Sequence, residues 1–271
     1  MVAVRRARRN RALPRRKRGL DGSALLALPL YDDYPRVGTP LVTYGLIAAC
    51  AAVFLWQDGL DAQAADDATY ALGMVPGVLF GEAELPARLR VVPAWATIFT
   101  SMFMHGGWLH LLGNMLYLWL FGRGVETALG PARYLVFYLV CGTVAALTQA
   151  AMAPESTIPM IGASGAIAGV LGAYLLLHPR GNVVVLIWIF VIVRLLNVPA
   201  LILLGIWFAL QLMSALAAPA NEPGVAAWAH VGGFVAGMIL VLFVRRPGVG
   251  ILQPSRTASF SLAPRRRGPW G

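Results

Sequence analysis

The chain alternates between long apolar runs and short segments rich in glycine, proline or charge. A bilayer core about 30 Å thick needs roughly 20 apolar residues in a helix, and six runs come close to this length or reach it. They cover residues 40–56, 97–121, 133–152, 163–177, 198–217 and 226–244. The fourth run is short and begins in a glycine-rich stretch. We therefore expect six membrane-spanning helices, one of which is short.

A seventh apolar run, residues 183–193, stops before Arg194, Asn197 and Pro199. It is too short to cross a bilayer comfortably, so we predict an interfacial or re-entrant segment. With the loops assigned alternately to the two sides, 20 of the 22 lysines and arginines fall on the side that holds both termini. The positive-inside rule makes that side cytoplasmic. A seventh span would place the basic C-terminal tail outside, so the charges independently favour six.

The composition supports a membrane protein, since 58% of the residues are hydrophobic and only 13% are charged. A soluble domain has about 25% charged residues, and a soluble chain this apolar would expose large apolar patches. The net charge of +10 would also fit nucleic-acid binding. However, the arginine run in residues 5–18 has no interleaved aromatic residues and adjoins the apolar runs. We therefore expect residues 1–39 to be a basic, disordered cytoplasmic segment lying on anionic lipid.

A few strongly polar side chains lie inside the apolar runs, where they are costly and therefore informative. His110 and Asn114 are four residues apart in the second run and share one helix face. Ser164 opens the fourth run, and His230 lies in the first turns of the sixth. The alternating topology places all four at a similar depth near the outer surface. His105, next to two glycines, is interpreted instead as a helix-entry or interface residue.

Each of these residues also has a purely structural explanation. A serine among glycines is usually a packing residue, and His110 with Asn114 could join two helices by hydrogen bonds. His230 could bond a neighbouring carbonyl group. The combination favours chemistry instead, because the fourth and sixth helices carry matching small-residue faces that permit close approach. These faces consist of Gly165 with Gly169 and Gly233 with Gly237.

Close approach of these two helices would allow His230 to take the proton of the Ser164 hydroxyl group, which is a poor nucleophile without a base. The attack creates an oxyanion, and the donors available are His110, Asn114 and the backbone N–H of Ser164. No acidic residue lies near His230 in any span, so the site is expected to be a dyad rather than a triad. No cysteine, histidine and carboxylate cluster has metal-ligand spacing, and no metal is expected.

Four motifs now identify a family resemblance. They are HGGWLHLLGN at residues 105–114, GRGVETALG at 122–130, GASGAIAG at 162–169 and AHVGGFVAG at 229–237. In this order and on these helices, the chain resembles the rhomboid intramembrane serine proteases. With the charge distribution, the resemblance implies an all-α membrane protein, a six-transmembrane-helix bundle with a short central serine-bearing helix and cytoplasmic N- and C-termini. Residues 40–244 would form the protease domain and residues 245–271 a basic cytoplasmic tail.

The resemblance also implies a function, the hydrolysis of peptide bonds in or near transmembrane segments of membrane proteins. Ser164 would be the nucleophile and His230 the general base, with His110, Asn114 and the Ser164 backbone at the oxyanion. The motif glycines of the site are Gly162, Gly165, Gly233 and Gly237. Transmembrane protein substrates and the lipid bilayer are the expected partners, nucleic acid is not, and no cofactor is needed. The simplest location is the plasma (inner) membrane of a bacterium.

Some features depart from the family pattern or leave alternatives open. Trp207 and Phe208 in the fifth run are either part of a lateral substrate gate or packing and lipid-facing residues. Many members have an aromatic residue four positions after the serine, against the catalytic histidine, where this chain has Ala168. The Trp-Arg pair common in the first outer loop is Trp95-Ala96 here, so that arginine is absent or replaced by Arg88 or Arg90.

Two other classes of function are alternatives to the protease. A catalytically inactive rhomboid-like protein that binds membrane helices would be marked by loss of the dyad, and both of its residues are present. A transporter would be marked by inverted repeats and polar sites at the membrane midplane. No inverted repeat is evident, and the polar groups gather near one face. The sequence therefore favours the protease.

Overall fold

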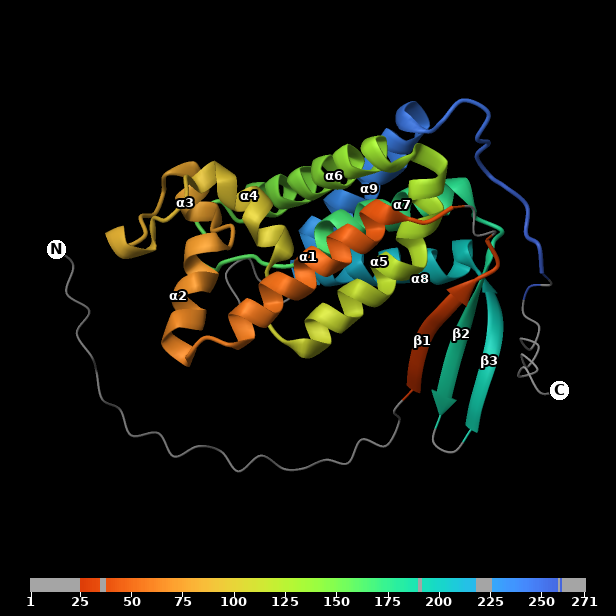
Figure 1. The fold of residues 1–271 in the computed structure, drawn as a ribbon, viewed down its shortest axis with the longest axis horizontal. Helices are drawn as coiled ribbons and strands as arrows, with labels where there is room; N and C mark the ends of the chain where they lie inside the picture. The colour runs from red at the N-terminus through yellow and green to blue at the C-terminus, as the bar shows by residue number, and fades with distance from the viewer. Residues whose placement is uncertain (1–24, 35–37, 190–191, 218–225, 258, 260–271) are drawn as a thin grey trace.

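The computed structural model describes residues 25–34, 38–189, 192–217, 226–257 and 259. This part of the chain is mostly helical, with a bundle of longer helices and a small sheet at one end (Figure 1). The longer helices are α1 (Leu41–Asp58), α5 (Trp108–Leu129), α6 (Pro131–Met152), α7 (Ser164–Leu177), α8 (Ala200–Ala217) and α9 (Ala227–Val244). The connection from α1 to α5 contains the short helices α2 (Ala62–Leu72), α3 (Pro76–Phe80), η1 (Ala87–Leu89), η2 (Ala94–Ala96), α4 (Thr97–Thr100) and η3 (Ser101–Phe103).

Four helices, α1, α6, α8 and α9, are long and apolar enough to cross a membrane. Their bounds lie within two residues of the predicted runs. Helix α7 is equally apolar, but its 14 residues span only about 21 Å at 1.5 Å per residue. The chain is therefore a helical membrane protein with a short helix among longer ones.

The second predicted run is not one continuous helix. Residues 97–103 form α4 and η3, and α5 begins only at Trp108, after Gly107 with φ of 152°. Helix α5 then continues to Leu129, beyond the predicted end at residue 121. This extension carries Glu126, whose carboxylate accepts hydrogen bonds from the N–H groups of Val42 (3.0 Å) and Thr43 (2.8 Å) at the start of α1. The buried carboxylate of Glu126 thus caps the N-terminal end of α1.

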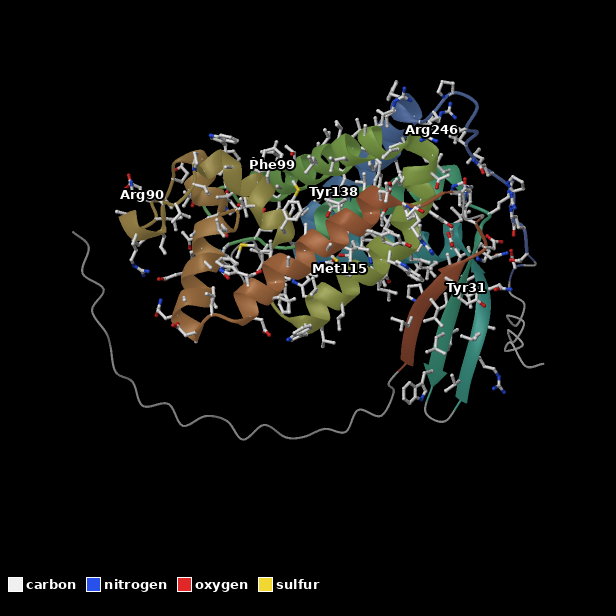
Figure 2. All side chains as sticks on the ribbon, viewed as in Figure 1. Tyr31, Arg90, Phe99, Met115, Tyr138 and Arg246 are labelled. Carbon is white, nitrogen blue, oxygen red and sulfur yellow. The ribbon has the colours of Figure 1, made fainter. Side chains whose placement is uncertain are left out.

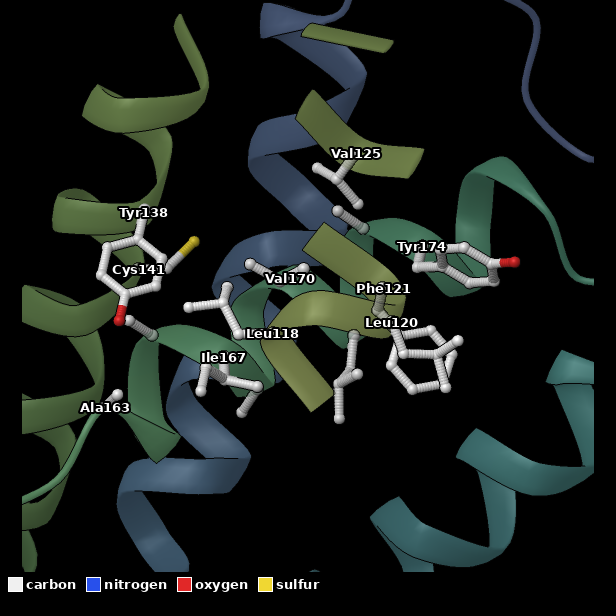
Figure 3. Packing of buried hydrophobic residues seen from close by; sticks show 14 of the residues in the cluster. Leu118, Leu120, Phe121, Val125, Tyr138, Cys141, Ala163, Ile167, Val170 and Tyr174 are labelled. Carbon is white, nitrogen blue, oxygen red and sulfur yellow. The ribbon is translucent and has the colours of Figure 1, made fainter. Parts of the chain in front are cut away.

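Helix α7 lies at the centre of the bundle, and of its residues only Ser164 and Leu176 are not buried. Figure 3 shows its side chains Ile167 and Val170 packed between residues of α5 and α6, among them Leu118 and Tyr138. Because α7 is covered on all sides, it needs no polar face. The central position of the short helix fixes Ser164 inside the protein rather than at its lipid surface.

The expected all-α class is wrong in one region. The run 183–193 belongs to an antiparallel hairpin of β2 (Asn182–Ile189) and β3 (Ile192–Pro199), and β2 also pairs with β1 (Leu25–Asp32) in the order β1-β2-β3. Valine and isoleucine, which favour strands, dominate the run. The partner β3 is adjacent in the sequence, but the other partner, β1, lies about 150 residues earlier, so no local pattern reveals the three-stranded sheet.

Strand β1 lies within the segment 1–39 for which disorder is expected, and it pairs with β2. Residues 1–24 and 35–37 of this segment lie outside the described part of the chain. Two residues of the C-terminal tail lie at the same place. The Asp33 carboxylate accepts hydrogen bonds from the N–H groups of Arg256 (3.2 Å) and Thr257 (3.1 Å). Figure 2 shows Tyr31 at this sheet end and Arg90 and Phe99 at the opposite end of the bundle.

Candidate functional site

Ser164 is the first residue of α7. The chain reaches it through Gly162, whose φ of 125° favours glycine and whose N–H donates to the Ser101 carbonyl group (2.8 Å). A Cβ atom at Gly162 would lie only 2.8 Å from the His110 ring. Glycine here therefore allows both the turn into α7 and the close approach of His110.

His230 on α9 meets Ser164 directly. Its Nε2 atom lies 2.8 Å from Ser164 Oγ, within hydrogen-bond distance. The helices α7 and α9 are in backbone contact just beyond this pair, because a Cβ atom at Gly233 would lie 2.1 Å from the Gly165 carbonyl oxygen. The two glycine faces predicted from the sequence thus pack against each other. Gly165 also faces α6, where Ala145 leaves no room for a side chain, at 2.7 Å.

His110 and Asn114 face the same site from α5. Gly106 N–H donates to His110 Nδ1 (3.3 Å), which leaves the other side of the ring towards Gly162. The Asn114 side chain is buried, and its amide Nδ2 has no hydrogen-bond partner in the described part of the chain. Asn114 therefore has a donor without a partner, and it lines the same cavity as Ser164 and His230.

These residues line one cavity of about 1070 Å³. Its wall includes Pro76 of α3 and Ile98 of α4, so it lies towards the end of the bundle opposite the sheet. Polar side chains from five helices and two connecting segments reach it: Ser101, His110, Asn114, Tyr117, Gln149, Ser156, Ser164, Gln211, Ser214 and His230. The wall thus combines apolar surface with polar groups that can hold water or a peptide.

His105 does not line the cavity. It is buried at 2% exposure, and its Nδ1 atom lies 3.2 Å from the Phe103 carbonyl oxygen. Its backbone N–H donates to Gln57 Oε1 of α1 (3.0 Å). Its contacts agree with a structural residue at the entry to α5.

The two aromatic residues of the fifth run have different surroundings. The Trp207 ring lines the cavity with its centroid 5.8 Å from that of His230. Phe208 instead stacks on Phe234 of α9 at 4.5 Å, tilted by 24°. Only Trp207 is therefore in direct contact with the site.

Two glutamines of the site were missed by the sequence analysis. Gln211 Oε1 lies 2.7 Å from Nδ1 of His230, and Gln149 Oε1 accepts from the Ala229 N–H (3.3 Å). A signal was available, because each is a polar residue inside an apolar run. Position 168 holds alanine and supplies no aromatic ring to His230. Gln211 and Trp207 contact the imidazole ring instead.

Arg88 and Arg90, in the connection between α1 and α5, lie away from this site. Arg88 pairs with Asp67, and Arg90 pairs with Glu84 at 3.3 Å. Neither arginine lines the cavity. Among the described residues, no group of three or more histidines, cysteines and carboxylates could hold a metal ion.

Comparison with known proteins agrees with this architecture. The family model of the rhomboid domain matches residues 93–247, more than half of the chain and all the helices from α5 to α9. The chain belongs to the rhomboid family. Family members include serine proteases and also inactive proteins, so membership alone does not decide whether this rhomboid is active.

Several named proteins are similar to this rhomboid. It is 31% identical to Rhomboid protease GluP of Bacillus subtilis over 138 residues, which are 51% of this chain and 25% of that protein. It is 30% identical to Rhomboid protein 1, mitochondrial, of Saccharomyces cerevisiae over 134 residues, 44% of this chain and 39% of that protein. With Rhomboid-type serine protease 2 of Emericella nidulans the identity is 27% over 157 residues, 56% of this chain and 27% of that protein. The matches thus cover less than half of each relative.

Proposed function

We propose that this rhomboid is an intramembrane serine endopeptidase that hydrolyses peptide bonds in or near transmembrane segments of membrane proteins. The observation that carries the proposal is the 2.8 Å contact between His230 Nε2 and Ser164 Oγ in a cavity lined by polar groups. The similarity to named rhomboid proteases supports it. No carboxylate is required, because the pair alone supplies a nucleophile and a base.

The reaction follows from the positions of these groups. Ser164 Oγ attacks the carbonyl carbon of the substrate peptide bond while His230 Nε2 takes the hydroxyl proton. The Asn114 amide, the His110 ring and the backbone N–H of Ser164 stabilise the oxyanion. His230 then gives the proton to the leaving amine, and a water molecule, activated by the same ring, releases the acyl group from Ser164. The free Asn114 Nδ2 donor supports this role for α5.

We further propose six membrane spans, α1 and α5 to α9, with both termini in the cytoplasm. The four long apolar helices and the excess of arginine and lysine at the termini support this topology. In it, the sheet lies on the cytoplasmic side and the cavity opens to the outer side. Residues 40–244 form the protease domain, and the plasma membrane of a bacterium is the proposed location. Trp207 is the better candidate than Phe208 for a substrate gate, since it faces the cavity.

Replacement of the two dyad residues tests the function. We expect Ser164→Ala and His230→Ala each to lower the cleavage of a model transmembrane substrate in liposomes by roughly 10³-fold or more, as loss of a nucleophile or base does in serine proteases. A fluorophosphonate probe should label the wild-type protein and not Ser164→Ala. The matched controls are Ser255→Ala and His178→Phe, which lie at the sheet end and should keep activity and labelling.

Three results would contradict the proposal. Cleavage that persists in Ser164→Ala would exclude Ser164 as the nucleophile. Cleavage that persists in His230→Ala at the wild-type rate would exclude its role as the base. A folded wild-type protein that neither cleaves nor reacts with the probe would favour an inactive rhomboid that binds membrane helices.

A further inference from the structure

The second ring nitrogen of His230 has a partner that the proposed chemistry leaves unexplained. Nδ1 lies 2.7 Å from Gln211 Oε1 on α8, while Nε2 lies 2.8 Å from Ser164 Oγ on α7. A carbonyl oxygen can only accept, so Nδ1 must carry the ring proton of neutral His230. Nε2 is then left with its lone pair towards the serine hydroxyl group. This is the one neutral tautomer in which His230 can act as the base.

In the described part of the chain, no carboxylate makes a hydrogen bond with the His230 ring. Helices α5 to α9 contain a single acidic residue, Glu126, and its carboxylate is occupied by the start of α1. A glutamine amide is neutral, so it orients the ring without the cost of a buried unpaired charge. It also stabilises the imidazolium ion less than a carboxylate would. Gln211 therefore bonds the same ring nitrogen that the carboxylate bonds in a Ser-His-Asp triad.

Helix α8 holds the imidazole by two side chains one turn apart. Gln211 bonds its edge, and Trp207, four residues earlier and so on the same helix face, lies 5.8 Å from it. The helix itself is sparsely packed, since only 17% of it is buried compared with 39% of α9. A displacement of α8 from α9 would withdraw both side chains from His230 at once.

We propose that Gln211 is a positioning residue that holds His230 in the Nδ1–H tautomer and so makes the reactivity of Ser164 depend on the position of α8. The inference rests on the proposed protease function. It assigns to α8 a role in the chemistry, besides any role in substrate entry. Gln211 itself touches neither Ser164 nor the reacting atoms; it acts through the imidazole.

Two substitutions separate positioning from packing. Gln211→Met keeps the length of the side chain but removes the acceptor. We expect kcat to fall about 10- to 100-fold, by analogy with the loss of the partners that orient metal-binding histidines, with KM changed less than about threefold. Gln211→Glu restores an acceptor and should recover kcat to within about threefold of the wild type at neutral pH. The matched control is Leu210→Ala, which alters an exposed neighbour on the same helix (57% exposed).

The pH profile gives a second readout. A carboxylate at position 211 favours the protonated imidazole, so the acid limb of kcat/KM should move to higher pH in Gln211→Glu by roughly one unit. His110 on α5 is the titratable residue that interacts with His230. The groups from α6, α7 and α8 in contact with His230 or its first turn are Gln149, Ser164, Gln211 and Trp207, all uncharged. A side chain at position 211 that did not contact His230 would not move this limb, while the fall of kcat in Gln211→Met reports the orienting role.

The tautomer can be observed without substrate. In ¹⁵N spectra of histidine-labelled protein, His230 should have a protonated Nδ1 and an unprotonated Nε2, and Gln211→Met should shift the population towards Nε2–H. An Nε2–H tautomer in the wild-type protein, or a Gln211→Met variant with unchanged kcat and spectrum, would overturn the inference. If instead the wild-type protein fails to cleave and to react with the probe, the protease proposal fails while the spectra still decide the role of Gln211.

Discussion

Gly237 on α9 packs directly against the backbone of α7 two turns below His230. A Cβ atom at this position would lie 1.9 Å from the Gly169 carbonyl oxygen and 2.6 Å from Gly169 Cα. Ordinary contact begins near 3.4 Å, so Gly237→Ala requires the two helices to separate by about 1.5 Å. The obstacle is backbone on both sides, and no side-chain rotation can relieve it.

The dyad does not tolerate this separation. Its contact of 2.8 Å can lengthen by only about 0.7 Å before the hydrogen bond is lost. A misplacement of about 1 Å can cost 10²-fold in rate, so we expect Gly237→Ala to react with a fluorophosphonate probe at least 10²-fold more slowly. Overpacking should also lower the free energy of unfolding by about 1–3 kcal/mol.

Gly205→Ala on α8 is the matched control, since nothing lies within 4 Å of its added Cβ atom. Because alanine favours a helix over glycine by roughly 0.5–1 kcal/mol, this variant should be as stable as the wild type or more so, with normal labelling. Thermal unfolding in detergent and the rate of probe labelling measure both effects. If Gly237→Ala melts and reacts like Gly205→Ala, backbone contact between α7 and α9 does not position the dyad.

Two further predictions concern stability. Glu126→Ala removes the acceptor for Val42 and Thr43 at the start of α1. It should lower the free energy of unfolding by about 2–3 kcal/mol, and Glu126→Gln should lower it less. Equal melting temperatures for the variants and the wild type would refute the capping role. Burial lowers the pKa of His178 at the end of α7 to about 4. Between pH 4 and 6.5 the folded protein therefore binds fewer protons than the unfolded chain. The stability that neutral His178 contributes is lost as the pH falls through that window. His178→Phe should flatten the pH dependence of unfolding there, and an unchanged slope would contradict the assignment.

Much of the helical framework could be predicted because it depends on local composition. Apolar runs bounded by glycine, proline and charge gave the bounds of α6 and α9 to within two residues. The prediction for the second run was wrong, because apolar residues continue on both sides of the break at Gly107. Its hydropathy alone cannot distinguish one long helix from two short ones followed by a turn.

The chain by itself determined which residues could carry the chemistry. Polar side chains are costly in apolar helices, so Ser164, His230, His110 and Asn114 stood out, and the glycine faces indicated which two helices approach. These properties belong to single residues and to spacings within one helix. They require no knowledge of the partners.

Only the tertiary structure decided how the groups meet. It paired β1 with β2 across some 150 residues, and it brought Trp207 and Gln211 of α8 to the ring of His230. The physical reason is the same in both cases. A strand's partner and a ring nitrogen's acceptor are set by the packing of distant segments, and their energies depend on distances of a few tenths of an ångström that no local pattern encodes.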